Sequence, residues 1–144
     1  MEKSYKAVID NVIPDKTRLL VTYKSDVLKK AIQNFQPLMD RNMATGELIE
    51  IGDWIRDENS LSNTINLNRT SHEVKKLYIE DGALVCEFRI LNTPSGTKLS
   101  TFMNSGELDI SIVKPTLRAK SSLHNGIVQD DLKIITVDFI YFEK

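Results

Sequence analysis

Residues 72–91 read HEVKKLYIEDGALVCEFRIL and carry the clearest β pattern of the chain. Asp81-Gly82 separates two β-rich runs, and an Asp-Gly pair in that position is the strongest short-range signal for a β-hairpin. In the second run, Leu84, Cys86, Phe88 and Ile90 fall on alternate positions. A strict period of two predicts a strand with one buried face. The stretch therefore predicts an antiparallel hairpin that packs one side against the core.

Further β-rich segments lie near the two ends of the sequence. Residues 5–13 and 17–23 are separated by Pro14-Asp15-Lys16, which is a turn sequence, so they predict a second hairpin. Residues 132–142, LKIITVDFIYF, are apolar on both sides. That pattern is typical of a central strand.

Between these ends, two segments alternate in hydropathy and two are polar. Residues 47–55 and 107–113 predict single strands, the latter with Asp109 and Ser111 opposite its apolar face. Residues 56–70 are Asn-rich and without clear periodicity, and predict a long mobile loop of the kind that is often functional. Residues 114–130 predict a second polar loop.

Two segments predict short helices. Residues 26–35 carry apolar side chains at helical spacing, with Ser25 as the expected N-cap and Pro37 as the expected end. Residues 97–104 predict a second helix that ends at Gly106. Six or seven strands with two short flanking helices predict an α+β fold with a mainly antiparallel sheet or barrel. We expect one domain spanning residues 1–144.

Composition argues against several functional classes. With 19 Lys plus Arg against 20 Asp plus Glu, the net charge is −1, which disfavours nucleic acid as the main ligand. The short apolar runs predict no membrane span, and the start MEKSYKAVID predicts no signal peptide. One cysteine and two histidines predict neither a disulfide framework nor a metal site. No phosphate-binding glycine loop is present in the sequence, so we expect no cofactor.

Ser111 and His72 are the candidate catalytic residues. A serine needs a base within hydrogen-bond reach to act as a nucleophile, and a histidine is the usual base. The plainer interpretation makes Ser111 a small polar residue on a solvent-facing strand and His72 a strand-edge residue. His124, in a loop, is a weaker candidate base, and Cys86 is expected to be a buried, inert thiol.

The order of motifs adds a family resemblance over roughly residues 20–142. ATGEL at 44–48 is followed by the hairpin sequence, by RILNTPSG at 89–96, and then by Gly106 and Ser111. This series resembles the prohead (capsid maturation) proteases of T-even-like tailed bacteriophages, which are similar to herpesvirus assemblins. The resemblance implies an assemblin-like small β-barrel flanked by helices, with Ser111 at the position of the nucleophile.

Two catalytic blocks of that family are altered here. Where the family has Gly-Val-Ser-Ser-Arg-Gly, Ser111 is kept, but Ile112 and Val113 replace the second serine and the arginine of the oxyanion site. In the family's Gly-Glu-Leu-Asn-His-Pro block, residues 46–48 match, but Ile49 and Glu50 follow, so the histidine base is missing. Loss of the base of a serine triad costs on the order of a millionfold in turnover. A glutamate with a pKa near 4.3 is a weak base toward serine.

Three hypotheses follow. The favoured one is a non-catalytic phage virion or head-assembly protein, located in the phage head and, during assembly, in the host cytoplasm. Its partners would be capsid or other head proteins, and self-association is left open. The alternative is an active serine endopeptidase that processes scaffold and capsid proteins with Ser111 as nucleophile and His72 as base. The third is an unrelated soluble binding module that only resembles the family.

Overall fold

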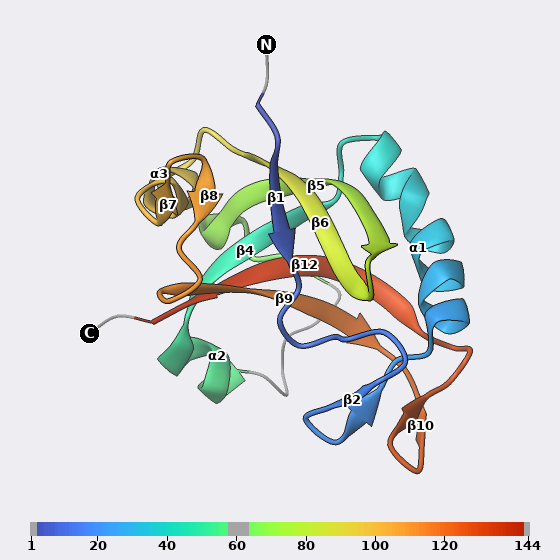
Figure 1. Ribbon diagram of the computed structural model, residues 1–144. Coiled ribbons are helices and arrows are strands. Elements are labelled where there is room, and N and C mark those ends of the chain that lie inside the picture. Colours follow the sequence, from blue (N-terminus) through green and yellow to red (C-terminus); the bar gives the residue numbers. More distant parts are fainter. Residues whose placement is uncertain (1–2, 58–63, 143–144) are drawn as a thin grey trace.

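The computed structural model describes residues 3–57 and 64–142, and a curled six-stranded sheet forms its centre (Figure 1). Neighbouring strands are antiparallel except for the parallel pair β4–β12. In spatial order the strands are β1 (Tyr5–Val8), β6 (Ala83–Ile90), β5 (Thr70–Glu80), β4 (Thr45–Glu50), β12 (Lys133–Tyr141) and β9 (Val113–Lys120). The expected α+β class with a mainly antiparallel sheet is therefore confirmed.

The predicted hairpin at 72–91 is confirmed as β5 and β6. Asp81 and Gly82 have φ angles of 52° and 76°, so the turn uses the left-handed region at both central residues. Leu84, Cys86 and Phe88 on β6 are fully buried, as their alternation predicts. The central strand predicted at 132–142 is also confirmed, because β12 lies between β4 and β9 and is buried on both faces.

The predicted hairpin of residues 5–13 with 17–23 is wrong. β1 pairs with β6 instead, with Tyr5 opposite Phe88. Thr17–Arg18 (β2) and Val21–Thr22 (β3) form a very short hairpin of their own. It belongs to a small second sheet with β10 (Leu123–His124) and β11 (Ile127–Val128). The turn at Pro14-Asp15 serves a different purpose, because the Asp15 carboxylate accepts the amide and hydroxyl of Ser25 at the start of α1.

Helix α1 (Ser25–Asp40) covers one side of the sheet and runs through Pro37. The predicted end at Pro37 is wrong because the buried stripe continues past the proline to Met39. Proline near the last turn removes only one backbone donor. Ser25 is the first helical residue, and its expected capping role is taken by the Asp15 side chain.

The remaining helices and loops differ from the sequence prediction in their boundaries. The strand predicted at 47–55 ends at Glu50, and helix α2 (Ile51–Asp57) follows it. Helix α3 (Pro94–Ser100) begins three residues earlier than predicted, because Thr93 Oγ1 caps it by accepting the Gly96 amide at 2.9 Å. The long loop predicted at 56–70 falls partly on residues 58–63, outside the described residues. Within the rest, a 3-10 turn η1 (Leu67–Arg69) precedes β5.

The segment predicted as a polar loop at 114–130 instead begins with β9, a full edge strand. Its register with β12 runs from Val113 opposite Tyr141 to Lys120 opposite Lys133. The loop prediction is wrong because it treats the polar residues of this segment as solvated. Arg118 is instead buried and forms an ion pair with Asp138. At the end of the segment, β10 and β11 form a short antiparallel hairpin where a loop was predicted.

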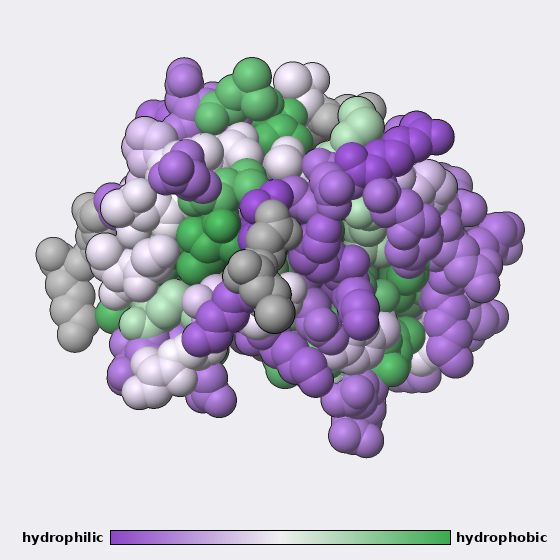
Figure 2. Space-filling view, turned by 90° about the horizontal axis from the view of Figure 1, so that it is seen from above, coloured by the Kyte–Doolittle hydropathy of each residue, from purple (hydrophilic) through white to green (hydrophobic). Residues whose placement is uncertain are grey.

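The sheet curls until its two edges nearly meet. Just after β1, the Asp10 amide donates to the Pro115 carbonyl at 3.0 Å, and Asn11 exchanges two hydrogen bonds with the backbone of Leu117. The two edge strands β1 and β9 are thus bridged at one end, while the rest of the β1 edge faces a groove. Seen from above, the surface over α1 is mostly hydrophilic, and hydrophobic surface gathers toward the α3 side (Figure 2). Among the helices of the described residues, none has the length and apolar character needed to cross a bilayer.

Candidate functional site

Ser111 lies on an exposed turn rather than in a strand, so the strand predicted at 107–113 is wrong. β8 (Glu107–Leu108) ends early and pairs with β7 (Met103–Asn104) through a turn at Ser105 and Gly106. Gly106, with a φ of 85°, therefore belongs to this hairpin and not to a helix end. The apolar alternation fails after Leu108 because Ile110 is 65% exposed.

The hydroxyl of Ser111 is held by a neighbouring carboxylate. Asp109 Oδ1 accepts the Ser111 amide at 3.1 Å and the Ser111 Oγ–H at 2.5 Å. The backbone carbonyl of Asp109 also accepts the amides of Ile112 and Val113, which completes the turn. A carboxylate is a weak base toward a serine hydroxyl, so this contact orders the turn more than it activates the oxygen.

His72 is fully buried on β5, and both of its ring nitrogens are engaged. Nε2 lies 2.6 Å from the Val137 carbonyl and Nδ1 lies 2.7 Å from Ser71 Oγ. A carbonyl can only accept, so Nε2 carries the proton and Nδ1 of the neutral ring accepts the hydroxyl of Ser71. The ring also packs against Phe139, at 4.3 Å between centroids. The serine that His72 holds is therefore its buried neighbour Ser71, and no hydrogen bond joins it to Ser111.

Gly46 gives the His72 ring its space. A Cβ atom at Gly46 would lie 2.2 Å from the Val137 oxygen and 2.3 Å from His72 Nε2. Both distances are far below van der Waals contact. Gly46 on β4, His72 on β5 and Val137 on β12 thus form one interlocked unit across three adjacent strands.

Burial lowers the pKa of His72 to about 4, although the hydrogen bond to Val137 opposes this shift. The unfolded chain binds this proton with a pKa near 6.5, so folding stability falls as pH drops below 6.5 and levels off below about 4. We expect His72 to contribute a loss of up to about 3 kcal/mol over that window. Urea unfolding at pH 7, 5.5 and 4 measures it. A His72→Gln variant should show a shallower dependence on pH, and an equal slope in both proteins would contradict the assignment.

Glu50 occupies the position where the resembling family has its histidine base. Its Oε2 accepts the amides of Gly52 at 2.8 Å and Asp53 at 3.3 Å, so the side chain caps the start of α2. Glu50 is aligned with Tyr141, and Tyr141 with Val113, across three strands. Glu50 and the end of the Ser111 turn, where β9 begins at Val113, therefore lie at the same end of the sheet, about 10 Å apart in strand spacing.

The same register places His72 away from that end of the sheet. His72 is opposite Gly46, four residues before Glu50 along β4. Four residues of a strand span about 13 Å.

A buried cluster of charges lies next to this region, and the sequence analysis missed it. The cluster comprises Glu47, Arg69, Arg118 and Asp138 and is called the Arg118 cluster here. Arg118 donates to Asp138 through Nε at 2.8 Å and Nη2 at 2.9 Å, and Nη2 also lies 2.7 Å from Glu47 Oε2. Arg69 Nε donates to the other Glu47 oxygen at 2.8 Å. Two carboxylates thus face two guanidinium groups in an interior position.

The environment of the Arg118 cluster shifts its proton equilibria. Burial raises the pKa of Asp138, while the guanidinium of Arg118 and the amide of Glu47 oppose that rise. Burial also lowers the pKa of Arg118, but the two carboxylates outweigh it and the net shift is upward. A charge inside an apolar strand was the available sequence signal, because Asp138 stands within the run ITVDFIYF. The hydrogen bonds from Arg118 to Glu47 and Asp138 join β9 to β4 and β12.

The other candidates of the sequence analysis, Cys86 and His124, lie elsewhere. Cys86 is fully buried, and burial raises the pKa of its thiol, as expected for an inert cysteine. His124 is exposed on β10. Trp54 on α2 lines a small pocket of about 160 Å³ beside Arg118 and Asp138. Over residues 3–57 and 64–142, no group of three or more His, Cys, Asp or Glu side chains could hold a metal ion.

Comparison with known proteins identifies a structural neighbour. The chain is similar in structure to the bacteriophage T4 capsid assembly protease, gp21, with a TM-score of 0.66 and 15% sequence identity. The superposition covers 96% of this chain and 81% of that chain. No protein-family model and no curated protein sequence matches the chain. The fold of a capsid assembly protease is therefore present over nearly the whole chain.

Proposed function

We propose that this chain is a non-catalytic phage head-assembly or virion protein built on a capsid-protease fold. It would act with capsid or other head proteins, in the host cytoplasm during assembly and in the phage head afterwards. The observation that carries the proposal is the combination of a fold match over 96% of the chain with a Ser111 hydroxyl that donates to Asp109 while the ring of His72 is bound to Ser71 and Val137.

The surroundings of the candidate residues support the absence of catalysis. Ser111 Oγ donates to Asp109, and the ring of His72 is fixed by Ser71 and Val137. Glu50, at the position of the family's base, directs its carboxylate to backbone amides of α2. A serine nucleophile requires a base within about 2.6–3.2 Å, and none of these groups supplies an imidazole to Ser111.

The residues that match the family's blocks also have structural roles here. Gly46 makes room for His72, Glu47 is held by Arg118 and Arg69, and Leu48 is 4% exposed in the core. The departures begin at the next positions, Ile49 and Glu50. Retention of the residues that hold the sheet, with loss of those that do chemistry, is what a structural descendant of a protease requires.

Quantitative mass spectrometry of purified particles tests this function. In particles of the phage that encodes the chain, we expect the intact protein in a fixed ratio to the capsid subunit. A catalytic maturation protease acts substoichiometrically and is not needed in the finished particle. Absence of the chain from both proheads and mature particles would contradict the proposal. Scaffold cleavage that stops in a Ser111→Ala phage would establish the endopeptidase alternative.

A further inference from the structure

We propose that the open edge of β1 binds an extended acidic segment of a partner protein, which adds to the sheet as a further strand. This edge would be the surface through which the head-assembly protein proposed above binds a partner. The inference rests on that proposed function only for the source of the partner.

The backbone of β1 has one side free for pairing. Tyr5 lies opposite Phe88, and in the same register the Ile9 amide donates to the Leu84 carbonyl. The odd-numbered residues of β1 therefore direct their backbone groups toward β6. In an antiparallel pair the alternate residues point the other way. Asp10 obeys this rule, since its amide donates to Pro115 on β9. The backbone groups of Lys6 and Val8 therefore face outward.

This free edge opens onto a groove of about 700 Å³. The groove is lined by β1, the β7–β8 hairpin and the first residues of β9. Its exposed apolar side chains are Val8 (58% exposed), Ile13 (37%) and Ile110 (65%). An unpaired strand edge beside apolar side chains is the arrangement by which proteins accept an added strand.

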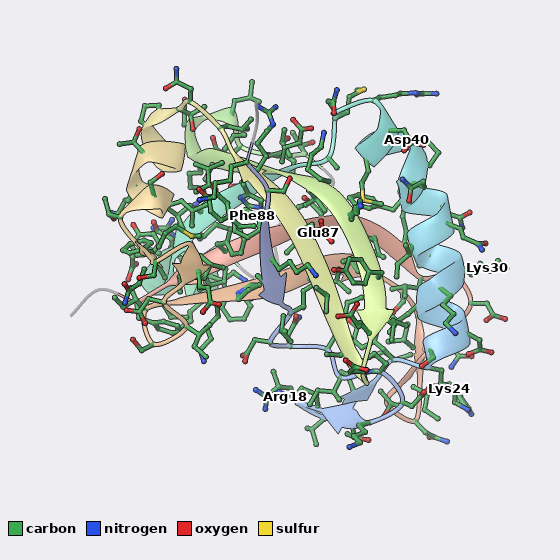
Figure 3. The ribbon with its side chains drawn as sticks, turned by 45° about the horizontal axis from the view of Figure 1, so that its top comes forward. Arg18, Lys24, Lys30, Asp40, Glu87 and Phe88 are labelled. Carbon is green, nitrogen blue, oxygen red and sulfur yellow. The ribbon has the colours of Figure 1, made fainter. Side chains whose placement is uncertain are left out.

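The charge of the groove selects the occupant. Its lining contains four cations and two anions, although the whole chain has a net charge of −1. The cations are Lys3, Lys6, Arg18 and Lys114, and the anions are Asp10 and Glu107. Asp10 is shared between Arg18 at 3.6 Å and Lys114 at 4.0 Å, so one carboxylate faces two cations. Arg18 lies beyond the end of β1 (Figure 3). An acidic strand complements this excess of positive charge.

A second copy of the chain is a poorer occupant of the same edge. Pairing β1 with β1 of another copy would bring Lys6 of both chains together on a strand of four residues, with Lys3 just before that strand in each chain. Like charges on paired strands are destabilising, and lysine on an edge strand is a common barrier to self-association. The β1 edge thus disfavours pairing with β1 of a second copy, while it can still pair with an acidic strand of a partner protein.

The test uses a synthetic acetylated nine-residue peptide of alternating glutamate and valine, with a matched peptide in which lysine replaces each glutamate. We expect the acidic peptide to bind the full chain, more weakly as salt is raised, and the basic peptide to bind at least tenfold more weakly. Hydrogen exchange followed by NMR gives the structural readout. On binding, the amides of Lys6 and Val8 should become protected, because they then donate to the added strand.

Two variants and one control locate the site. Val8→Pro removes an outward donor without touching the ladder to β6, so the chain should fold and lose most of its affinity for the peptide. Lys114→Glu should weaken binding about fivefold or more. Lys30→Glu makes the same change of charge on α1, away from β1 (Figure 3), and should leave binding unchanged.

Each outcome decides the inference. Equal binding of both peptides, unprotected Lys6 and Val8 amides in the complex, or a dimer formed through β1 without peptide would each overturn it. These measurements need no phage particle. A chain that binds the acidic peptide but is absent from particles would refute the proposed function alone, and a particle protein that ignores the peptide would refute this inference alone.

Discussion

Arg118→Leu is expected to lower the free energy of unfolding by about 3–5 kcal/mol, among the largest effects of any single substitution in this chain. Arg118 is 6% exposed and holds both Glu47 and Asp138, so its removal leaves two buried carboxylates with one remaining cation, Arg69. Urea unfolding followed by circular dichroism measures the change.

The penalty of Arg118→Leu should also depend on pH. Once the guanidinium is gone, burial dominates the pKa of Asp138, so lowering the pH from 7 to 5 should recover part of the lost stability by protonation. A double variant, Arg118→Leu with Asp138→Leu, should be less destabilised than the sum of the two single variants.

Arg18→Leu is the matched control for Arg118. Its partner Asp10 lies at 3.6 Å, and both side chains are about 40% exposed. An exposed ion pair contributes at most about 1 kcal/mol, so this variant should unfold nearly as the parent does. Equal effects of the two arginine substitutions would mean that the Arg118 cluster does not hold the sheet together.

Gly46→Ala is the second substitution with a large expected effect. The new Cβ would collide with the Val137 oxygen and with His72 Nε2, which leaves either the hydrogen bond between them broken or the β4–β12 pairing distorted. Overpacking and an unsatisfied buried donor together should cost about 3–5 kcal/mol. Thermal and urea unfolding give the value, and the loss of protection of amides on β4 would show where the strain falls.

Gly52→Ala provides the control for this glycine. A Cβ added at Gly52 would lie 2.8 Å from Glu50 Oε2, the end of a flexible side chain. Gly52 also lies in α2, where alanine is a better helix former than glycine. We expect little change in stability. A Gly46→Ala protein within about 1 kcal/mol of the parent would contradict the interlocking of β4, β5 and β12 described above.

The sequence predicted the hairpin and the central strand because their local patterns are decisive. Asp81-Gly82 specifies its turn by backbone conformation alone, and residues 132–142 are apolar on both faces. β9 could not be recognised in the same way, because the sequence alone predicts a solvated Arg118 and therefore a loop. Arg118 is buried only because Asp138 and Glu47, which are distant in sequence, lie beside it. Pairing of β1 with β6 is also set by tertiary contacts, and the local turn at Pro14-Asp15 pointed to a nearer partner.

The candidate site was only partly accessible from the sequence. Ser111 was placed on a strand because Leu108, Ile110 and Ile112 alternate, yet Asp109 forms a turn with Ser111 that interrupts this alternation. His72 is expected at a strand edge, but it is fully buried. Its burial depends on Gly46 and Val137, which lie on two other strands. Such long-range contacts have no local signature.

Labelling of the purified chain with a fluorophosphonate probe, read by intact mass, shows whether Ser111 is an activated nucleophile. A serine activated by a base reacts rapidly with this probe, whereas an ordinary hydroxyl does not. With Ser111 bound to Asp109 and His72 occupied by Ser71 and Val137, we predict no adduct under conditions that fully label a serine protease run in parallel. One adduct per chain that disappears in Ser111→Ala would show an activated Ser111, contradict the non-catalytic assignment and favour the endopeptidase alternative.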